Sequence, residues 1–178
     1  LTETALSLSR DRFRLAGLKG EFRRTDGDAI PYPDSSFDIV CSMGVLHHIE
    51  NPRPMLDEMY RVLRPGGVCM FSTLGPDTLK ELRAAYAQVD THVHVHRFID
   101  LHDYGDMLVH ARLADPVMDM ECLTLTYPDV RALLRELKAA GAGNTDPRRA
   151  IGLTGKGTVL RMERAYEGER REGRLPAT

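Results

Sequence analysis

Polar and small side chains gather around one stretch, residues 26–44, that could line a binding pocket. Residues 37–43 are apolar and rich in β-branched types, which predicts a strand buried on both faces of a sheet. Asp28 lies in the loop before this strand, and Ser42 and Gly44 lie where the strand ends. Ligands bind at the carboxyl ends of strands in open parallel sheets. The spacing therefore predicts a nucleotide-type pocket at this edge.

Histidines occur in two groups that raise the question of a metal site. His47 and His48 are adjacent, so on a helix they would point about 100° apart and would not easily bind one metal ion. His92, His94 and His96 alternate, and on a strand they would share a face, as a zinc triad requires. Because their neighbours predict a loop, we interpret them as incidental loop histidines and expect no metal site.

The elements that would position these residues alternate between helix and strand. The first half predicts a helix at 2–16, strands at 21–25 and 37–43, a helix from the 51–54 segment to about 64, and a strand at 68–74. The second half predicts helices at 77–89, 100–112, 129–140 and 156–173, with an extended segment at 115–127. This order indicates a parallel α/β sheet with crossover helices.

Composition narrows the class of protein. The 178 residues are 42% hydrophobic and 28% charged, with a net charge of −2, which favours one soluble domain and argues against general nucleic-acid binding. Cys41 and Cys69 lie in apolar runs, so we expect buried thiols and a reducing compartment. No apolar run is long enough to span a membrane. We therefore expect a cytoplasmic protein that binds neither membranes nor nucleic acid.

Three segments in combination resemble the class I methyltransferases that use S-adenosylmethionine (SAM). They are Gly-Asp-Ala-Ile-Pro-Tyr-Pro-Asp-Ser-Ser-Phe-Asp at 27–38, Gly-Val-Leu-His-His-Ile at 44–49 and Arg-Val-Leu-Arg-Pro-Gly-Gly at 61–67. The resemblance covers residues 1–74 and implies a Rossmann-like sheet with SAM as the cofactor. It also implies cofactor-binding roles for individual residues. On the adenine side, Asp28 would accept a hydrogen bond from the adenine amino group, and Ala29 would contribute its backbone N–H. Ser42, Met43 and Gly44 would lie beside the methionine and methyl groups, and His47 would face the pocket.

The second half is similar to the malonyl-acyl-carrier-protein O-methyltransferases of biotin synthesis. The matching segments are 71–83, 96–103, 123–129, 137–144 and 173–178. The resemblance implies a single, partial methyltransferase domain over 1–178 with a substrate-covering insert at 75–114. It further implies malonyl-acyl carrier protein or malonyl-CoA as the partner.

Within that insert, Arg97 and the neighbouring His96 are the substrate-binding candidates. A malonyl thioester has one free carboxylate, and the planar guanidinium of an arginine can bind it through two hydrogen bonds. The alternative is a surface ion pair between Arg97 and Asp100 or Asp103. The basic residues of 147–178 present a similar choice, because they either dock an acidic carrier protein or lie on a solvated helix.

The chain departs from the family pattern at its start, because neither the glycine-rich loop nor the acidic residue after the second strand is present. We expect an α/β sheet that is incomplete at both ends. A carboxylate is already ionised at neutral pH, so methyl transfer to it requires no general base, and no catalytic residue is predicted. Three alternatives remain open: a quinone-type small-molecule methyltransferase, an arginine hydroxylase of respiratory-complex assembly, and an inactive truncated remnant.

Overall fold

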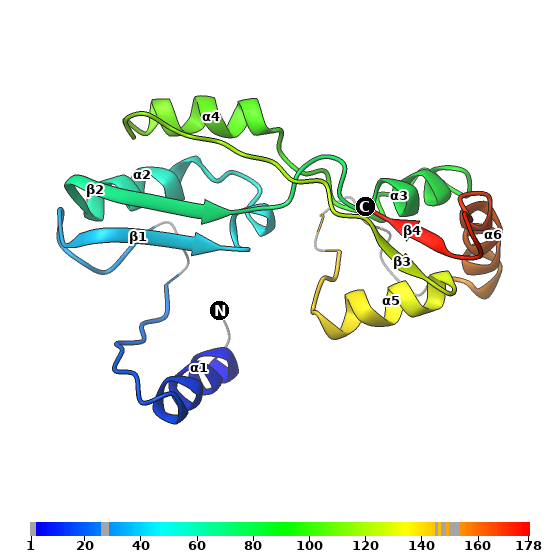
Figure 1. Ribbon diagram of the computed structural model, residues 1–178, viewed down its shortest axis with the longest axis horizontal. Coiled ribbons are helices and arrows are strands. Elements are labelled where there is room, and N and C mark those ends of the chain that lie inside the picture. Colours follow the sequence, from blue (N-terminus) through cyan, green and yellow to red (C-terminus); the bar gives the residue numbers. More distant parts are fainter. Residues whose placement is uncertain (1–2, 26–28, 145, 147–148, 150–153) are drawn as a thin grey trace. The chain divides into compact units, whose positions relative to one another are not determined.

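The computed structural model describes residues 3–25, 29–144, 146, 149 and 154–178. In chain order the elements are α1 (Glu3–Leu15), β1 (Phe37–Met43), the 3-10 helix η1 (Leu46–His48), α2 (Arg53–Val62), β2 (Leu63–Ser72), α3 (Lys80–Ala87), α4 (Leu101–His110), β3 (Leu125–Tyr127), α5 (Val130–Ala139), α6 (Lys156–Glu167) and β4 (Leu175–Ala177) (Figure 1). They form two compact units, Leu1–Thr73 with Tyr104–Val117, and Leu74–Asp103 with Met118–Thr178. The prediction of one domain with an insert at 75–114 stays a prediction.

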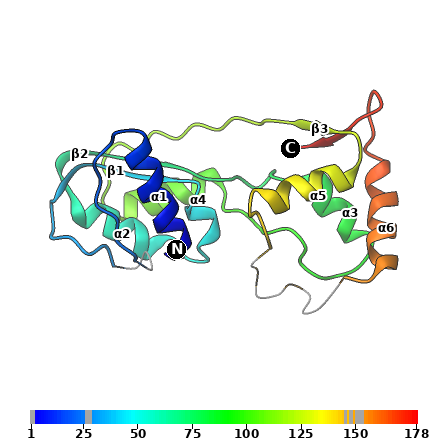
Figure 2. The ribbon, with the colours of Figure 1, turned by 90° about the horizontal axis from the view of Figure 1, so that it is seen from below.

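The first unit is built on two parallel strands, β1 and β2, with α2 as the connection between them. Parallel strands need such a crossover because the chain must return to the starting edge of the sheet. The apolar stripe of α2, Leu56, Met59 and Val62, is almost completely buried. Tyr104 of α4 packs against Phe71 of β2, with 5.7 Å between the ring centroids. In the turned view of Figure 2, α2 and α4 both lie below the two strands.

The other face of the β1–β2 sheet is open, which corrects the prediction that residues 37–43 are buried on both faces. Ile39 and Met43 are 57% and 59% exposed, and Val68 on the paired strand is 52% exposed. Cys41 is also exposed rather than buried, and Cys69 is half-buried, where burial raises the pKa of its thiol. The reason is that α2 and α4 contact only one face, so alternate side chains of each strand remain in solvent.

Two further segments predicted to be extended do not form the expected strands. Residues 21–25 are irregular, and Arg23 instead donates a hydrogen bond to the Pro31 carbonyl and lies over the Tyr32 ring. Of the segment 115–127, only β3 pairs with another strand. A strand needs a neighbour for its backbone N–H and C=O groups, and in the described residues neither segment has one along its full length.

The second unit places α3, α5 and α6 beside an antiparallel ribbon of β3 and β4 (Figures 1 and 2). Its core contains Leu82, Val95, Leu133, Met162 and Tyr166. The Tyr166 hydroxyl donates a 2.7 Å hydrogen bond to the Pro176 carbonyl, so this buried phenol also holds β4. Helix α6 ends at Glu167, earlier than the predicted 173. Across both units, none of the described helices has the length and apolar character needed to cross a membrane.

Candidate functional site

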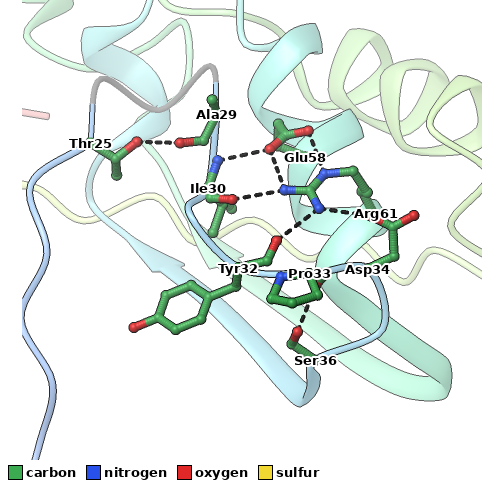
Figure 3. Close-up of polar contacts among 9 residues, drawn as sticks. All are labelled: Thr25, Ala29, Ile30, Tyr32, Pro33, Asp34, Ser36, Glu58 and Arg61. Carbon is green, nitrogen blue, oxygen red and sulfur yellow. Dashed lines mark hydrogen bonds and ion pairs between the residues drawn. The ribbon is translucent and has the colours of Figure 1, made fainter.

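Two residues of α2 fix the loop that leads into β1. Glu58 and Arg61 lie three positions apart, so they occupy neighbouring places on one side of the helix. Arg61 Nε and Nη2 donate to the two carboxylate oxygens of Glu58 at 2.7 and 2.8 Å, a bidentate pair. The second oxygen of Glu58 also accepts the backbone N–H of Ile30 at 2.7 Å. Figure 3 shows both side chains directed at this loop.

Arg61 makes three more contacts along the same loop. Its guanidinium donates to the carbonyls of Ile30 at 2.8 Å and Tyr32 at 2.9 Å, and to the Asp34 carboxylate at 2.8 Å (Figure 3). The carbonyl groups of a loop without strand partners are thereby satisfied by one side chain. We call Glu58 and Arg61 the loop clamp, since together they hold residues 30–34 against α2.

The electrostatics of the loop clamp follow from this geometry. Hydrogen bonds from Arg61 and from the Ile30 N–H lower the pKa of Glu58 from 4.5 to about 2. The same carboxylate, together with Asp34, raises the pKa of Arg61 above its usual range. Both groups are therefore charged at neutral pH, and the clamp is an ion pair under those conditions.

The predicted adenine-binding residues lie immediately before this clamped segment. Asp28 lies outside the described residues, so its role stays a prediction. Ala29 is exposed, and its carbonyl accepts a 2.6 Å hydrogen bond from the Thr25 hydroxyl. Ile30, the next residue, is the one that Glu58 and Arg61 both bind. The loop clamp thus anchors the chain one residue beyond Ala29.

The residues predicted to lie beside the methionine and methyl groups of the cofactor, 42–44, occupy the carboxyl end of β1. Ser42 is 4% exposed, and its Oγ has no hydrogen-bond partner among the described residues. Gly44 adopts a left-handed φ of 65° and donates its N–H to the Ser72 carbonyl at 3.0 Å. A Cβ atom at Gly44 would meet no atom within 4 Å, so open space borders this turn. Met43 points away from the packed face and is 59% exposed.

His47 follows in η1, which Leu46 anchors with a completely buried side chain. The rings of His47 and His48 lie 4.1 Å apart, centroid to centroid. Residues 42–44 and His47 are therefore neighbours at one end of β1. Ala29 belongs to the loop before β1, and the contacts of the described residues include none between Ala29 and this group.

Arg97 and His96 lie in the second unit, in the loop before α4. The carbonyl of His96 accepts a 3.2 Å hydrogen bond from Arg83 Nη2 of α3. Arg83 also donates to the carbonyls of Pro76 and Thr78, both at 2.9 Å, so it ties two loops together. Burial, first, and the nearby charge of Arg97 lower the pKa of Arg83. Two guanidinium groups thus stand close to each other at this loop.

The side chain of Arg97 is exposed and takes part in no ion pair within the described residues. Asp100, its proposed surface partner, accepts instead from the backbone and ring of His102 at 2.8 and 2.9 Å. The ion-pair alternative for Arg97 therefore has no support in this geometry.

The histidine loop is organised around the carboxylate of Asp90. His94 Nε2 lies 2.8 Å from the Asp90 carboxylate, and its ring stacks on Tyr86 at 3.8 Å. The backbone N–H of His92 donates to the same carboxylate at 2.9 Å. Within the described part of the chain, no cluster of three or more His, Cys, Asp or Glu residues could hold a metal ion.

Sequence reasoning missed Glu58, Arg61 and Arg83. A glutamate and an arginine three apart on a helix usually form a solvated pair, so the spacing alone carried no functional signal. Arg61 does begin the Arg-Val-Leu-Arg-Pro-Gly-Gly segment that supported the family resemblance. The place of Arg61 in this segment was the signal that the sequence offered. The three-dimensional contacts explain it, because they show that Arg61 binds the loop before β1.

Residues 1–71 match the family model described as a methyltransferase domain. Two solved structures also align with nearly the whole chain. They are the YcgJ protein of Bacillus subtilis (TM-score 0.62, 18% identity, 97% of this chain and 67% of that one) and a proposed methyltransferase of Bacillus halodurans (TM-score 0.63, 16% identity, 99% and 76%). At such identities they establish the fold, and the predicted Rossmann-like α/β architecture is confirmed.

Curated relatives are similar over the second unit as well. A malonyl-[acyl-carrier protein] O-methyltransferase of Gallionella capsiferriformans is 52% identical over 153 residues, which are 86% of this chain and 53% of the relative. Its counterpart from Laribacter hongkongensis is 46% identical over 185 aligned residues, 100% of this chain and 62% of the relative. The chain thus spans about half to three fifths of the length of these relatives.

Proposed function

We propose that this chain is part of a SAM-dependent methyltransferase that acts on the free carboxylate of malonyl-acyl carrier protein, with a place in biotin synthesis. The observation that carries the proposal is 46% identity to a relative of that name across all of this chain. The identity extends through the unit that contains Arg97, whereas the general methyltransferase-domain model matches only residues 1–71. Fold alone would not suffice, because the [4+2]-cyclase SpnF also has this fold (TM-score 0.53, 19% identity).

The residues at the end of β1 suit a bound cofactor. Ser42 has a buried hydroxyl without a partner in the described structure, and such groups are rare unless a ligand or water satisfies them. The left-handed turn at Gly44 leaves room for close approach of a ligand to the backbone. SAM, when bound, supplies a methyl group activated by the adjacent sulfonium.

The contribution of this chain would be to bind and orient. Ser42 and Gly44 would hold the methionine side of the cofactor, and the loop clamp would fix the backbone next to Asp28 and Ala29 on the adenine side. In the second unit, Arg97 would bind the malonyl carboxylate. A carboxylate oxygen would take the methyl group as its bond to sulfur breaks, and no proton would be transferred. Positioning and exclusion of water would supply the rate.

The test is methyl transfer from radiolabelled SAM to a malonyl thioester, measured together with SAM binding by calorimetry. Arg97→Ala should raise the KM for the malonyl substrate about tenfold or more, because a charge-assisted bidentate contact is lost. It should leave the Kd for SAM unchanged. Arg135, exposed on α5 and outside the proposed site, provides the matched control Arg135→Ala. An unchanged KM in the Arg97 variant would remove Arg97 from the proposal, and the absence of any methyl transfer would refute the proposed function.

A further inference from the structure

The outer side of α6 presents a cationic face to solvent. Helix α6 packs Met162 and Tyr166 into the core, where both side chains are completely buried. The exposed side chains on the rest of its surface include Lys156, Leu160, Arg161 and Arg164. We call these four residues the α6 cationic face. Leu160 is 48% exposed and lies one turn from Lys156 and from Arg164, so an apolar contact point stands between positive charges.

The carboxylates of α6 do not neutralise this face, because both are already paired. Glu163 accepts from Arg131 of α5, with a shortest distance of 2.6 Å. Glu167 accepts from Arg170 at 2.7 Å through both of its oxygens. Each of these pairs has a net charge of zero.

Lys156, Arg161 and Arg164, by contrast, have no carboxylate partner among the described residues. Arg161 Nη2 instead donates a 3.4 Å hydrogen bond to the Thr158 hydroxyl. Three unpaired cations therefore stand on one helix of a chain whose overall net charge is −2. A local excess of this sign steers and orients an acidic partner.

Three other basic side chains near the C-terminal end have structural partners. Arg170 donates to the carbonyls of Pro128 and Gly173, and Arg174 donates to the carbonyl of Thr126. Arg149 donates to the carbonyl of Asn144. These residues hold loops and strands of the second unit. Among the described basic side chains of 147–178, those without such a partner are the three of α6 and Arg171, which lies in the loop before β4.

We propose that the α6 cationic face is the docking surface for an acidic surface helix of the carrier protein that presents the malonyl group. This inference rests on the proposed function, which requires such a partner. A face formed by a helix of about 18 Å provides a small contact, and small interfaces are typical of partners that must bind and leave in each cycle. Acidic residues that flank one apolar side chain on the partner would match the charges around Leu160.

The experiment measures binding of acyl carrier protein to the 178-residue chain by fluorescence anisotropy at low and moderate salt. The test variant combines Lys156→Glu, Arg161→Glu and Arg164→Glu. The matched control combines Arg12→Glu, Lys19→Glu and Arg24→Glu, which reverses three exposed charges in the first unit and changes net charge equally. The α6 variant should weaken carrier binding at least tenfold and reduce its salt dependence, while the control should change the Kd less than threefold.

Failure of this inference is distinguishable from failure of the proposed function. Equal effects of the two triple variants, or no binding of the carrier by the unmodified chain at low salt, would overturn the docking surface. Methyl transfer to the malonyl thioester of a small thiol does not involve docking and tests the function by itself. Both triple variants should leave that reaction unchanged, so loss of transfer to the carrier-linked substrate in the α6 variant alone would support the inference.

Discussion

Glu58→Gln is the substitution that tests the loop clamp with the least change of shape. Glutamine keeps the size of the side chain, and its amide oxygen can still accept hydrogen bonds. Its amide NH₂ can only donate, however. It would replace one of the two carboxylate oxygens that accept from Arg61 and from the Ile30 N–H, and would therefore face a donor. The variant therefore loses the charge of the carboxylate and at least one of its three hydrogen bonds. We expect a less stable first unit and a looser segment at 30–34.

The magnitude follows from the pKa of Glu58, which falls from 4.5 to about 2 in the folded chain. A difference of this size corresponds to at most about 3–4 kcal/mol. The Glu58 side chain is 19% exposed and that of Arg61 is 31% exposed, so contact with solvent reduces the expected loss to about 2 kcal/mol. With a typical urea dependence for a small protein, this loss shifts the unfolding midpoint by about 1 M.

The stability difference between the unmodified chain and the variant should depend on pH in one direction. Because the folded-state pKa of Glu58 is depressed, its stabilising effect is fully present above about pH 4.5 and is lost as the pH falls towards 2. Glutamine does not titrate. The difference in unfolding free energy between the unmodified chain and the variant should therefore be about 2 kcal/mol at pH 6 and should shrink steadily below pH 4.5.

The assay is urea unfolding followed by far-ultraviolet circular dichroism between pH 2.5 and 7. Amide exchange of the 30–34 segment at pH 6 gives a local readout, since Ile30 N–H is bound directly to Glu58. Glu3→Gln serves as the control, because Glu3 forms an exposed 3.4 Å pair with Arg10 that should contribute little. A stability difference that stays constant across the pH range, or one no larger than that of the control, would refute the reasoning.

Two further changes test the second unit. Asp129→Ala removes the side chain that caps α5 by accepting the Ala132 N–H at 2.8 Å, and thermal unfolding should show a loss of about 1 kcal/mol that Asp129→Asn largely restores. Tyr166→Phe leaves the Pro176 carbonyl without its buried donor and should lower the unfolding free energy by about 1–2 kcal/mol in urea titration; an unchanged midpoint would contradict a role for this hydroxyl in holding β4.

The local pattern of the sequence was sufficient for much of the fold. The predicted strand at 37–43 has the same bounds as β1, and the apolar stripe after Pro54 predicted α2 with its buried Met59 and Val62. Asp129 marked the start of α5. Such features depend on residues that are neighbours in the chain, and periodicity and capping record them directly. The family resemblance at 27–38 and 61–67 likewise rests on short segments.

Tertiary structure decided which of these residues have partners. The same Ile39 and Met43 that indicated a buried strand are more than half exposed, because only one face of the sheet receives helices. Strand pairing at 21–25 failed for a related reason, since a strand depends on a neighbour that the local pattern does not specify.

Side-chain partners depend even more on distant parts of the chain. Arg61 binds a loop about 30 positions earlier in the sequence, and Arg170 binds a carbonyl 42 positions away. Arg164 resembles both in type and has no such partner within the described residues. Composition and spacing could identify all three as cations. Only the folded chain decided which of their charges are used within the protein and which remain available to a partner, because those contacts form between segments that folding alone brings together.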